Sequence, residues 1–487
     1  MKVLSCEQVR NVENSAVCGG LFSYTQLMQK AGKAVFDAII SKYDVVGKSF
    51  LIIIGNGNNG GDGLVVSDLL RSAGAFVELY IPFGMPSTET ASKFAEKIMH
   101  LPINHGINKD YDFYIDALFG IGFNRKLNDD IQYLIGILNR KKGIKIAVDI
   151  PSGMFADGGM AQEVFSADLT VTFISYKICQ LIPPTSSYCG EIIVNDLGID
   201  VGDNYSYSIV EPPIAKVYDK NSHKGTFGTA LLVCGSYGMC GAQILSAKAA
   251  CVSGAGIVKA IVCDRNYSAF NTSVPEAVTI PVETSIAGAP IIYDKTVLSA
   301  LSKANSVLIG CGLGQSDDSV SIVKKVLSYT NVPTVIDADG INAVARDISI
   351  LRNIKAPYIL TPHPGEMARL INTTVADVEN NRISYAKRFA CNHQCVLVLK
   401  GANTIIASPQ GEVFFNCYGN YGMAKGGSGD VLSGIIVALL ANGYDTLTAA
   451  KTAVYVHAKA GDMAAEKYNK RTMLPSDILG ELKFISF

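Results

Sequence analysis

A glycine-rich stretch near the C-terminus combines groups that bind anions with a carboxylate that can accept a proton. It begins at Gly419, reaches Asp430 and leads directly into the apolar segment 431–440, which indicates a helix. The first backbone N–H groups of a helix have no intrahelical partner, and the helix dipole adds positive charge behind them. Because several residues of the loop are glycines, a phosphate can approach the backbone closely. The stretch therefore predicts a phosphate site.

Asp430 has two interpretations at this position. Aspartate is a common N-cap, and as a cap it would only satisfy helix amides. Beside a bound phosphate it would instead act as a general base and take the proton of a hydroxyl group that attacks the terminal phosphoryl group. The preceding glycines favour the second interpretation.

The N-terminal half places polar side chains after apolar runs. The run 50–55 is followed by the loop 56–63, rich in asparagine and glycine, and then by a helical segment 64–73. Aspartates end two further strand-like runs, at Asp116 and at Asp149, and Ser152 follows the second. Because ligands gather at the carboxyl edge of a parallel sheet, we expect these groups to converge with Asn58–Asp62. Their oxygen atoms suit a hard cation. A plain turn is the alternative for the loop.

The C-terminal half repeats the alternation of strand, loop and helix. His363 lies between two prolines after the strand-like run 358–361, and Lys400 ends the run 396–400. The prolines fix the backbone of His363, which favours a positioned contact over a loop histidine without chemistry. Lys400 is interpreted as facing phosphate, with a solvated strand end as the alternative. Asp337 and Asp339 are interpreted as helix caps and are given no role.

These elements predict an α/β protein of two doubly wound domains. The spacing of apolar residues over 6–43 indicates an opening helical pair, and the segments 171–174 and 192–194 are expected to close the first sheet. Glu211, Pro212 and Pro213 interrupt regular structure. We therefore expect a Rossmann-like three-layer domain at 1–212 and a second domain at 213–487.

Composition excludes several classes of function. The 487 residues carry a formal charge of −1, which gives no field for nucleic acid or an acidic membrane. No segment offers about 18 continuous apolar residues, and Glu7 and Arg10 interrupt the start of the chain where a signal peptide would be apolar. We expect a cytoplasmic protein. The twelve cysteines include no Cys-x-x-Cys pair, and the cluster Cys391, His393 and Cys395 is not favoured as a metal site.

The first half resembles the NAD(P)H-hydrate epimerase family in the loop 56–63, in Asp116 with the segment 120–125, and in the segment 148–153. The resemblance implies that Asp149 is the catalytic acid/base and that a K⁺ ion is bound by Asn59, Asp116 and Ser152. Gln29 departs from the usual glutamate, and Asn128 departs from a frequent glycine. The implied substrate contacts are Asn58, Asn59, Gly60, Gly61, Asp62, Gly120, Ile121, Gly122, Phe123, Asn124, Arg125, Lys126 and Asp149.

The second half resembles the NAD(P)H-hydrate dehydratase family, whose fold is ribokinase-like. The matching motifs are 224–228, 312–314, 361–367, 400–404 and 419–430, whereas Cys311 departs from the usual proline. The resemblance implies that Ala242, Gly314, His363 and Asp430 contact the hydrate, with Asp430 as the catalytic base. The implied nucleotide contacts are Lys400, Gly401, Ala402, Asn403, Thr404 and Gly429.

Together the resemblances imply two activities on hydrated nicotinamide cofactors. The first domain would interconvert the R and S forms of NADHX and NADPHX with K⁺. The second would dehydrate the S form with ADP and Mg²⁺, and it would release AMP and phosphate. The alternative is a small-alcohol kinase fused to a nucleotide-binding module without turnover. We also expect a homo-oligomer, with a homotetramer as one candidate form.

Overall fold

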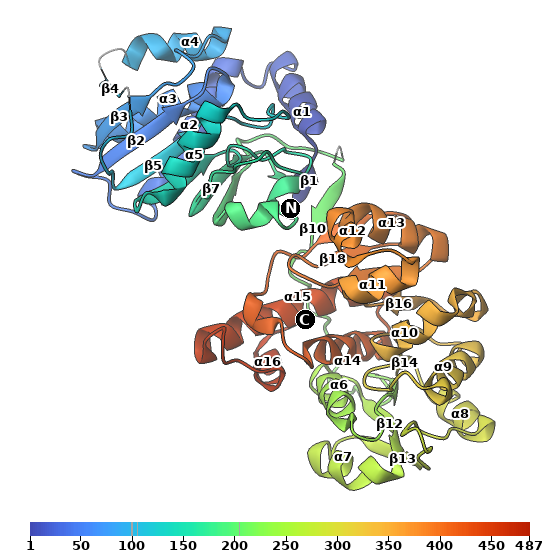
Figure 1. The fold of residues 1–487 in the computed structure, drawn as a ribbon. Coiled ribbons are helices and arrows are strands. Elements are labelled where there is room, and N and C mark those ends of the chain that lie inside the picture. The colour runs from blue at the N-terminus through green and yellow to red at the C-terminus, as the bar shows by residue number, and fades with distance from the viewer. Residues whose placement is uncertain (99–100, 105, 204) are drawn as a thin grey trace. The chain divides into compact units, whose positions relative to one another are not determined.

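A wholly or mostly parallel sheet lies at the centre of each of two units, Met1–Ser208 and Ile209–Phe487 (Figure 1). The computed structural model describes residues 1–98, 101–104, 106–203 and 205–487. The α/β class and the two wound sheets predicted from the sequence are confirmed. No helix in the described part of the chain is both long enough and apolar enough to cross a membrane.

The first unit has a sheet in the order β4-β3-β2-β5-β6-β7-β9, and all neighbouring strands are parallel. Its interior strand β2 (Ser49–Ile54) is apolar and buried on both faces, as expected for a strand covered by helices on each side. A small ladder joins β1 to β8 and to β10. The other strands are β1 (Lys2–Leu4), β3 (Phe76–Tyr80), β4 (Ile103–Asn104), β5 (Phe113–Ala117), β6 (Ile144–Val148), β7 (Leu169–Phe173), β8 (Tyr176–Lys177), β9 (Glu191–Asn195) and β10 (Tyr207–Ile209).

Helices cover both faces of the first sheet and make three layers. The apolar faces of α1 (Cys6–Cys18), α2 (Tyr24–Ile40), α3 (Asn58–Ser72) and α4 (Glu89–Ala95) pack in one core. The face of α5 (Asp129–Arg140) packs on the opposite side of the sheet. The predicted opening helical pair is confirmed as α1 and α2, and each of these helices begins with a capping box.

The glycine-rich segment after β2 is helical, whereas the sequence predicted a loop as far as residue 63. Helix α3 begins at Asn58, directly after the N-cap residue Gly57. A Cβ atom on Gly60 would lie 1.9 Å from the carbonyl oxygen of Gly55, and one on Gly61 would lie 2.6 Å from Met28. These glycines therefore let the start of the helix pack directly on the strand end, which a pattern-based prediction of loop did not anticipate.

The second unit has a sheet in the order β13-β12-β11-β14-β15-β16-β17-β18-β19. Neighbours are parallel from β13 to β17, whereas β18 pairs antiparallel with both β17 and β19, so the sheet is mixed at this edge. Strands β18 and β19 have three residues each, which is too short to show the alternation of apolar and polar residues that predicts an antiparallel strand. The strands are β11 (Thr229–Val233), β12 (Ile257–Cys263), β13 (Val278–Val282), β14 (Ser306–Ile309), β15 (Thr334–Ile336), β16 (Tyr358–Leu360), β17 (Val396–Leu399), β18 (Ile405–Ala407) and β19 (Val413–Phe415).

Helix α14 (Ser428–Ala441) is buried along its length at the centre of the second unit's core, together with α6, α15 and α16. A Cβ atom on Gly434 would lie 2.3 Å from the carbonyl oxygen of Ser246, so α14 and α6 touch through backbone. Helix α6 begins at Cys240. The other helices are α6 (Cys240–Val252), α7 (Tyr267–Ser273), α8 (Asp294–Leu301), α9 (Asp317–Tyr329), α10 (Asp339–Arg346), α11 (Pro364–Ile371), α12 (Val375–Asn380), α13 (Arg382–His393), α15 (Thr446–Tyr468) and α16 (Pro475–Glu481).

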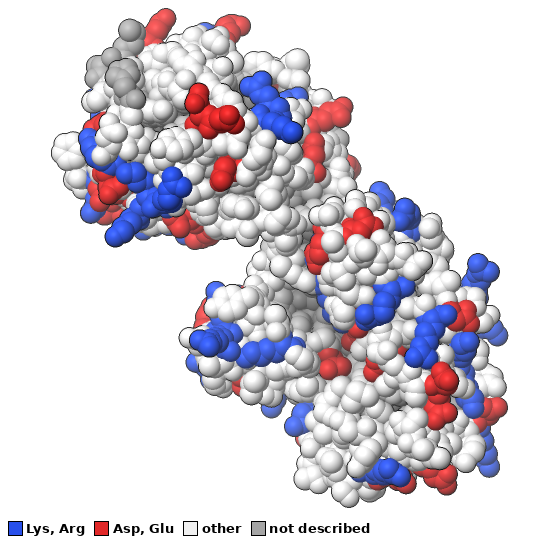
Figure 2. Space-filling view, in the orientation of Figure 1, with Lys and Arg blue, Asp and Glu red and all other residues white. Residues whose placement is uncertain are grey.

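Charged side chains of both signs are interspersed over the visible surface (Figure 2). This distribution matches the formal charge of −1. A basic stripe of the kind that follows a nucleic-acid backbone is not seen on the described residues of this face.

Candidate functional site

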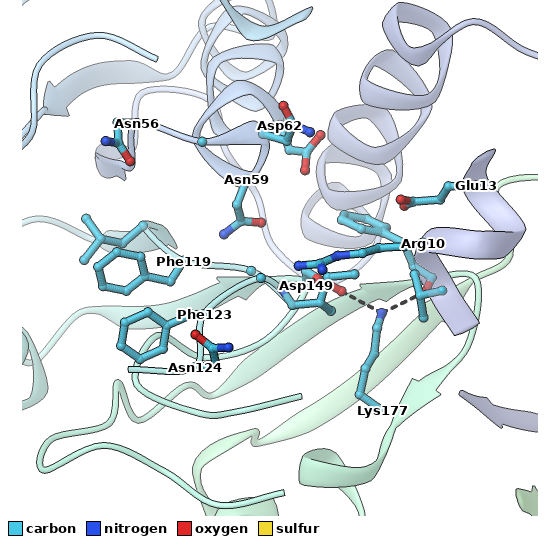
Figure 3. Close-up of a pocket in the computed structure, with 18 of the residues that line it drawn as sticks. Arg10, Glu13, Asn56, Asn59, Asp62, Phe119, Phe123, Asn124, Asp149 and Lys177 are labelled. Atoms are coloured by element: carbon cyan, nitrogen blue, oxygen red, sulfur yellow. Dashed lines mark hydrogen bonds and ion pairs between the residues drawn. The ribbon is translucent and has the colours of Figure 1, made fainter. Parts of the chain in front are cut away.

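A cavity of about 680 Å³ opens at the carboxyl ends of the first unit's strands (Figure 3). Many predicted contact residues line it, whereas Gly60, Gly61 and Lys126 are not among its lining residues in the described chain. The cavity thus brings together loops from three strand ends, as the parallel arrangement predicted. The predicted residues that line it are Asn58, Asn59, Asp62, Gly120, Ile121, Gly122, Phe123, Asn124, Arg125 and Asp149.

Asp149 lies at the floor of this cavity, directly after β6. Its φ of 68° is in the left-handed region, which is rare for a residue other than glycine and turns the side chain away from the strand direction. Its Oδ1 accepts hydrogen bonds from Lys177 Nζ at 2.6 Å and from Thr172 Oγ1 at 3.1 Å. Among the described residues, its Oδ2 accepts one hydrogen bond, the long bond from the Ile121 N–H at 3.3 Å. Oδ2 is therefore the oxygen available to a ligand.

Lys177, to which the sequence analysis gave no role, is the ion-pair partner of Asp149. Only 1% of its side chain is exposed, and its ammonium group also donates to Thr172 Oγ1 at 2.7 Å and to the Phe173 carbonyl oxygen at 2.8 Å. Figure 3 shows the side chain rising from β8 to Asp149. A lysine within an otherwise apolar buried segment was a signal that could have been used, because such a charge needs a partner.

Three further charged side chains face the cavity near Asp149, namely Arg10 and Glu13 from α1 and Asp62 from α3 (Figure 3). Burial, followed by the negative charge of Asp149, raises the pKa of both Glu13 and Asp62. The sequence analysis gave Arg10 and Glu13 no role in the site. The cavity can therefore exchange protons at more than one carboxyl group.

The three residues proposed for K⁺ meet at one loop beside the cavity. Asp116 Oδ1 accepts from Ser152 Oγ at 2.7 Å and from the Leu118 N–H at 3.1 Å, while its Oδ2 accepts from the Ser152 N–H at 2.7 Å. The Phe119 N–H donates to Ser152 Oγ at 3.0 Å. Asn59 packs beside Gly120 on the same loop. Burial raises the pKa of Asp116 to about 6.

This donor set fits a hard monovalent cation. The carboxylate of Asp116 and the hydroxyl of Ser152 each keep an unused lone pair, and all the donors are oxygens. The amide nitrogen of Asn59 is buried and has no hydrogen-bond partner among the described residues. Because the nitrogen and oxygen of an amide are assigned rather than observed, turning this group offers its oxygen at the same place.

The second site lies at the N-terminus of α14. Its N-cap residue is Gly427, with φ of 103°, so Asp430 is the third residue of the helix and the interpretation of Asp430 as an N-cap is wrong. The amides of Gly429 and Asp430 have no protein acceptor within the described part of the chain. Burial, followed by the charge of Asp337, raises the pKa of Asp430 to about 6. Unpaired amides and a carboxyl group thus share one helix turn.

An ion-pair network lies beside Asp430 and includes Asp337, which had been interpreted as a cap. Lys400 Nζ lies 2.7 Å from Asp337 Oδ1 and 4.0 Å from Glu366 Oε2. Ser433 Oγ donates to Asp337 Oδ2 at 2.8 Å. Burial opposes ionisation of Asp337, but Lys400 lowers its pKa, whereas burial raises the pKa of Glu366 to about 7.

The predicted nucleotide loop adjoins this network through Lys400. A Cβ atom on Gly429 would lie 3.2 Å from Lys400 Nζ, so glycine permits the approach. Gly401 packs against the guanidinium of Arg382, and Thr404 Oγ1 donates to the Gly401 carbonyl oxygen at 3.1 Å. Residues 400–404 therefore form a tight turn between β17 and β18, with Gly401, Ala402 and Asn403 near its tip.

Three of the predicted hydrate contacts of this unit, Ala242, Gly314 and His363, lie on separate segments of the chain. Ala242 is in the first turn of α6 and lies close to Gly312, and the Gly314 N–H donates to Asp339 Oδ2 at 2.8 Å. His363 caps α11, because its Nδ1 accepts from the N–H groups of Gly365 and Glu366. Burial lowers the pKa of His363, which leaves a neutral ring whose orientation the cap fixes.

A metal-like cluster also occurs here, since ligand atoms of Cys311, Asp337 and Asp430 lie within 4.8 Å of one another. Magnesium prefers oxygen ligands, and a thiol is a soft ligand. The ammonium group of Lys400, 2.7 Å from Asp337, already supplies the positive charge. These side chains therefore do not suit Mg²⁺, and we assign it no protein ligand.

Comparisons with known proteins match both units. The family model described as NAD(P)H-hydrate dehydratase matches residues 230–483, and the model described as YjeF-related protein N-terminus matches residues 24–179. The bifunctional NAD(P)H-hydrate repair enzyme of Moorella thermoacetica is 35% identical over 94% of this chain and 92% of its own. The enzyme of the same name from Escherichia coli is 33% identical over 96% of this chain and 90% of its own.

Solved structures resemble the second unit. A hypothetical protein of Streptococcus mutans has a TM-score of 0.50 at 28% identity, over 56% of this chain and 96% of its own. The ADP/ATP-dependent NAD(P)H-hydrate dehydratase of Bacillus subtilis, crystallised with ATP and Mg²⁺, has a TM-score of 0.49 at 32% identity, over 56% of this chain and 93% of its own. Given the identity along nearly the whole sequence, the chain belongs to the bifunctional NAD(P)H-hydrate repair enzyme family.

Proposed function

We propose that the chain repairs hydrated NADH and NADPH in two steps. The first domain, residues 1–212, interconverts the R and S hydrates. The second domain, residues 213–487, dehydrates the S hydrate at the expense of ADP. The proposal rests on two carboxyl groups, each beside a site of suitable shape. Asp149 lines the cavity of the first unit, which has room for part of a dinucleotide, and Asp430 lies at the N-terminus of α14, where a phosphate can bind.

In the first domain Asp149 is the acid/base. Its Oδ2 faces the cavity, while its Oδ1 is held by Lys177 and Thr172, so the carboxylate has one reactive oxygen and a fixed direction. Lys177 balances the negative charge whenever Asp149 is ionised. The hydrate lies along Asn58–Asp62 and Gly120–Lys126, with the glycine amides beside its phosphates. Oδ2 donates a proton to the ring hydroxyl, and the bond from carbon to oxygen breaks as water leaves and the ring nitrogen shares its electron pair with that carbon. Water then adds from the opposite face and returns a proton to Oδ2, which inverts the hydroxylated carbon.

Potassium would be held by Asn59, Asp116 and Ser152. Its charge would organise the loop 118–120, whose N–H groups already bind the Asp116 and Ser152 side chains. Those same residues lead into the predicted substrate segment.

In the second domain Asp430 is the base. Its carboxylate takes the proton of the ring hydroxyl, whose oxygen forms a bond to the terminal phosphorus of ADP, and the bond from that phosphorus to the bridging oxygen breaks to give AMP. The phosphorylated hydroxyl then leaves as phosphate when the neighbouring carbon loses a proton, which restores the reduced nicotinamide. The amides of Gly429 and Asp430 stabilise the charge on the transferring phosphoryl group. Mg²⁺ would be held by phosphate oxygens of the nucleotide.

The remaining contacts follow from the loops of this site. Ala242, Gly314 and His363 surround the hydrate beside Asp430. The turn at Lys400, Gly401, Ala402, Asn403 and Thr404, together with Gly429, binds the adenine nucleotide. The side chain of Lys400 extends from this turn toward Gly429 in α14, so its ammonium group can contact a phosphate bound there.

Incubation of the full chain with mixed R and S hydrates tests the proposal. With ADP we expect complete recovery of the reduced-nicotinamide absorbance, with one AMP and one phosphate for each NADH. Without epimerisation only the S form would disappear quickly and the R form would persist at its spontaneous rate. A stable phosphorylated product in place of phosphate and NADH would instead indicate a small-alcohol kinase.

The homo-oligomeric state and the cytoplasmic location stay predictions. Size-exclusion chromatography with light scattering tests the first, and fractionation of cells tests the second.

A further inference from the structure

The glycine-rich loop before α14, residues 419–427, is attached to α15 by one carboxylate. Asp462 Oδ2 accepts from the Gly419 N–H at 2.9 Å, and Asp462 Oδ1 accepts from Asn420 Nδ2 at 2.9 Å. The same side-chain nitrogen of Asn420 also donates to the Gly461 carbonyl oxygen at 3.0 Å. The start of the loop is therefore held by hydrogen bonds to two adjacent residues of α15.

Close packing around this attachment restricts where the loop can lie. Gly419 has a φ of 101°, and a Cβ atom on it would lie 3.4 Å from the Cβ of Ala458 on α15. The Gly422 N–H donates to Asn420 Oδ1 at 3.0 Å, and a Cβ atom on Gly422 would lie 2.2 Å from the carbonyl oxygen of Lys470. The hydrogen bonds to Asp462 thus belong to one position of the loop.

The far end of the loop leads into the phosphate site. Lys425 Nζ donates to the carbonyl oxygen of Arg471 at 2.9 Å, so a second bond ties the loop to the chain beyond α15. Two residues later Gly427 is the N-cap of α14. A Cβ atom on Gly426 would have no atom within 4 Å, so this part of the loop faces open space. The attachment at α15 and the open phosphate site are therefore opposite ends of one short segment.

We propose that Asp462 is a positioning residue of the dehydratase site, which holds the loop 419–427 so that the unpaired amides at the start of α14 point at the terminal phosphate of ADP. The inference rests on the proposed ADP-dependent dehydration. Amides that stabilise a transferring phosphoryl group must be aimed before the reaction, and a small displacement lowers the rate. A carboxylate suits the role because it accepts from two donors at once, in hydrogen bonds stronger than those between neutral groups.

Dehydration kinetics of Asp462 variants test the proposal. Asp462→Ala removes both acceptors, and we expect kcat/KM for ADP to fall about tenfold, the change that loss of one hydrogen bond to a charged group produces. Part of this fall should be a rise in the KM for ADP, because a displaced loop also binds phosphate less well. Partial unfolding would lower kcat alone. An unchanged KM for ADP in Asp462→Ala would therefore overturn the proposal.

Asp462→Asn keeps the shape of the side chain and one of its two acceptor oxygens. Its kcat/KM should lie between those of the wild type and Asp462→Ala, and it carries the comparison if Asp462→Ala does not fold. An Asp462→Asn variant with wild-type kinetics would show that the side chain only fills space. Epimerisation on the same chain should stay unchanged in both variants.

Asp445→Ala is the matched control, because Asp445 caps the opposite end of α15 by accepting from the Thr448 N–H at 2.9 Å. It should leave kcat and the KM for ADP unchanged. An equal rise in KM in Asp445→Ala would show that the loss comes from α15 itself. In the double variant Asp462→Ala with Asn420→Ala the two losses should not multiply, since both act through one attachment. Losses that multiply would contradict the shared attachment.

The wild-type chain separates this inference from the proposed function. A wild type that does not dehydrate the S hydrate would refute the proposed function, and ADP binding measured by isothermal titration calorimetry would still test whether Asp462→Ala weakens the phosphate site. A wild type that dehydrates, together with an Asp462→Ala variant of wild-type KM and kcat, would overturn the Asp462 inference alone.

Discussion

The two sites pair an aspartate with a buried lysine in different ways. In the first unit Lys177 binds Asp149 itself, at 2.6 Å. In the second unit Lys400 binds Asp337, at 2.7 Å, and Asp430 lies beside this ion pair without being part of it. The first arrangement neutralises the working carboxylate and fixes one of its oxygens. The second leaves the working carboxylate beside a like charge, with a pKa of about 6.

The difference matches the two reactions proposed. An epimerase must both remove and return a proton, so a carboxylate that Lys177 and Thr172 hold in one direction can do both from the same oxygen. A base in phosphoryl transfer only has to accept a proton from a weakly acidic hydroxyl, and a raised pKa makes it a better acceptor.

The largest effect should come from removing each carboxylate. Asp430→Asn should lower the dehydration rate by roughly 10²–10⁴-fold and leave epimerisation intact, because general bases contribute about that much. Asp149→Asn should do the reverse. Both rates are measured in one reaction mixture by chiral separation of the hydrates. An Asp430→Asn variant that dehydrates normally would contradict the assignment.

Breaking the lysine pair in the first unit should reduce its stability. Lys177→Met leaves Asp149 buried without a counter-charge, and the loss of one partner of such a pair costs about 3–5 kcal/mol. Differential scanning calorimetry of the full chain should show an early transition. The double variant Lys177→Met with Asp149→Asn should recover much of this loss, because it leaves no buried charge. Failure of the second change to rescue the first would mean that the ion pair is not the source of the loss.

The pH dependence should distinguish the two sites. Since Asp430 must be ionised to accept a proton, dehydration should fall about tenfold per pH unit below about 6. Asp337→Asn removes the negative charge that raises the pKa of Asp430, so the acidic limb should move to lower pH. Rates are measured at saturating ADP and hydrate, with epimerisation on the same chain as an internal control. An unmoved limb would show that Asp337 does not act on Asp430 through its charge.

The aspartates were predictable from the sequence because Asp149 ends an apolar run and Asp430 follows a glycine-rich loop at the start of one. Their partners were not. Lys177 lies on a strand of two residues, which is too short to recognise from the sequence. Asp337 lies between the end of β15 and the start of α10, where an aspartate is equally typical of a helix cap. Both pairings join residues that are 28 and 63 positions apart, so only the fold brings them together. Helix α3 was placed too late because its glycines, which normally weaken a helix, are needed for close packing on β2.

Potassium should give the smallest effect and one confined to the first unit. If Asn59, Asp116 and Ser152 hold K⁺, a concentration about tenfold above its Kd should stabilise that unit by roughly 1.4 kcal/mol. The measurement is thermal unfolding in KCl, NaCl and choline chloride at equal ionic strength. Ser152→Ala removes a hydroxyl that both supports Asp116 and would bind the ion, so the variant should lose the difference between KCl and choline chloride. The second unit supplies the control, because its Lys400 provides positive charge from the chain itself and its transition should not distinguish the salts. Equal stabilisation by all three salts would mean that Asn59, Asp116 and Ser152 bind no K⁺ and only stabilise the loop 118–120 through hydrogen bonds.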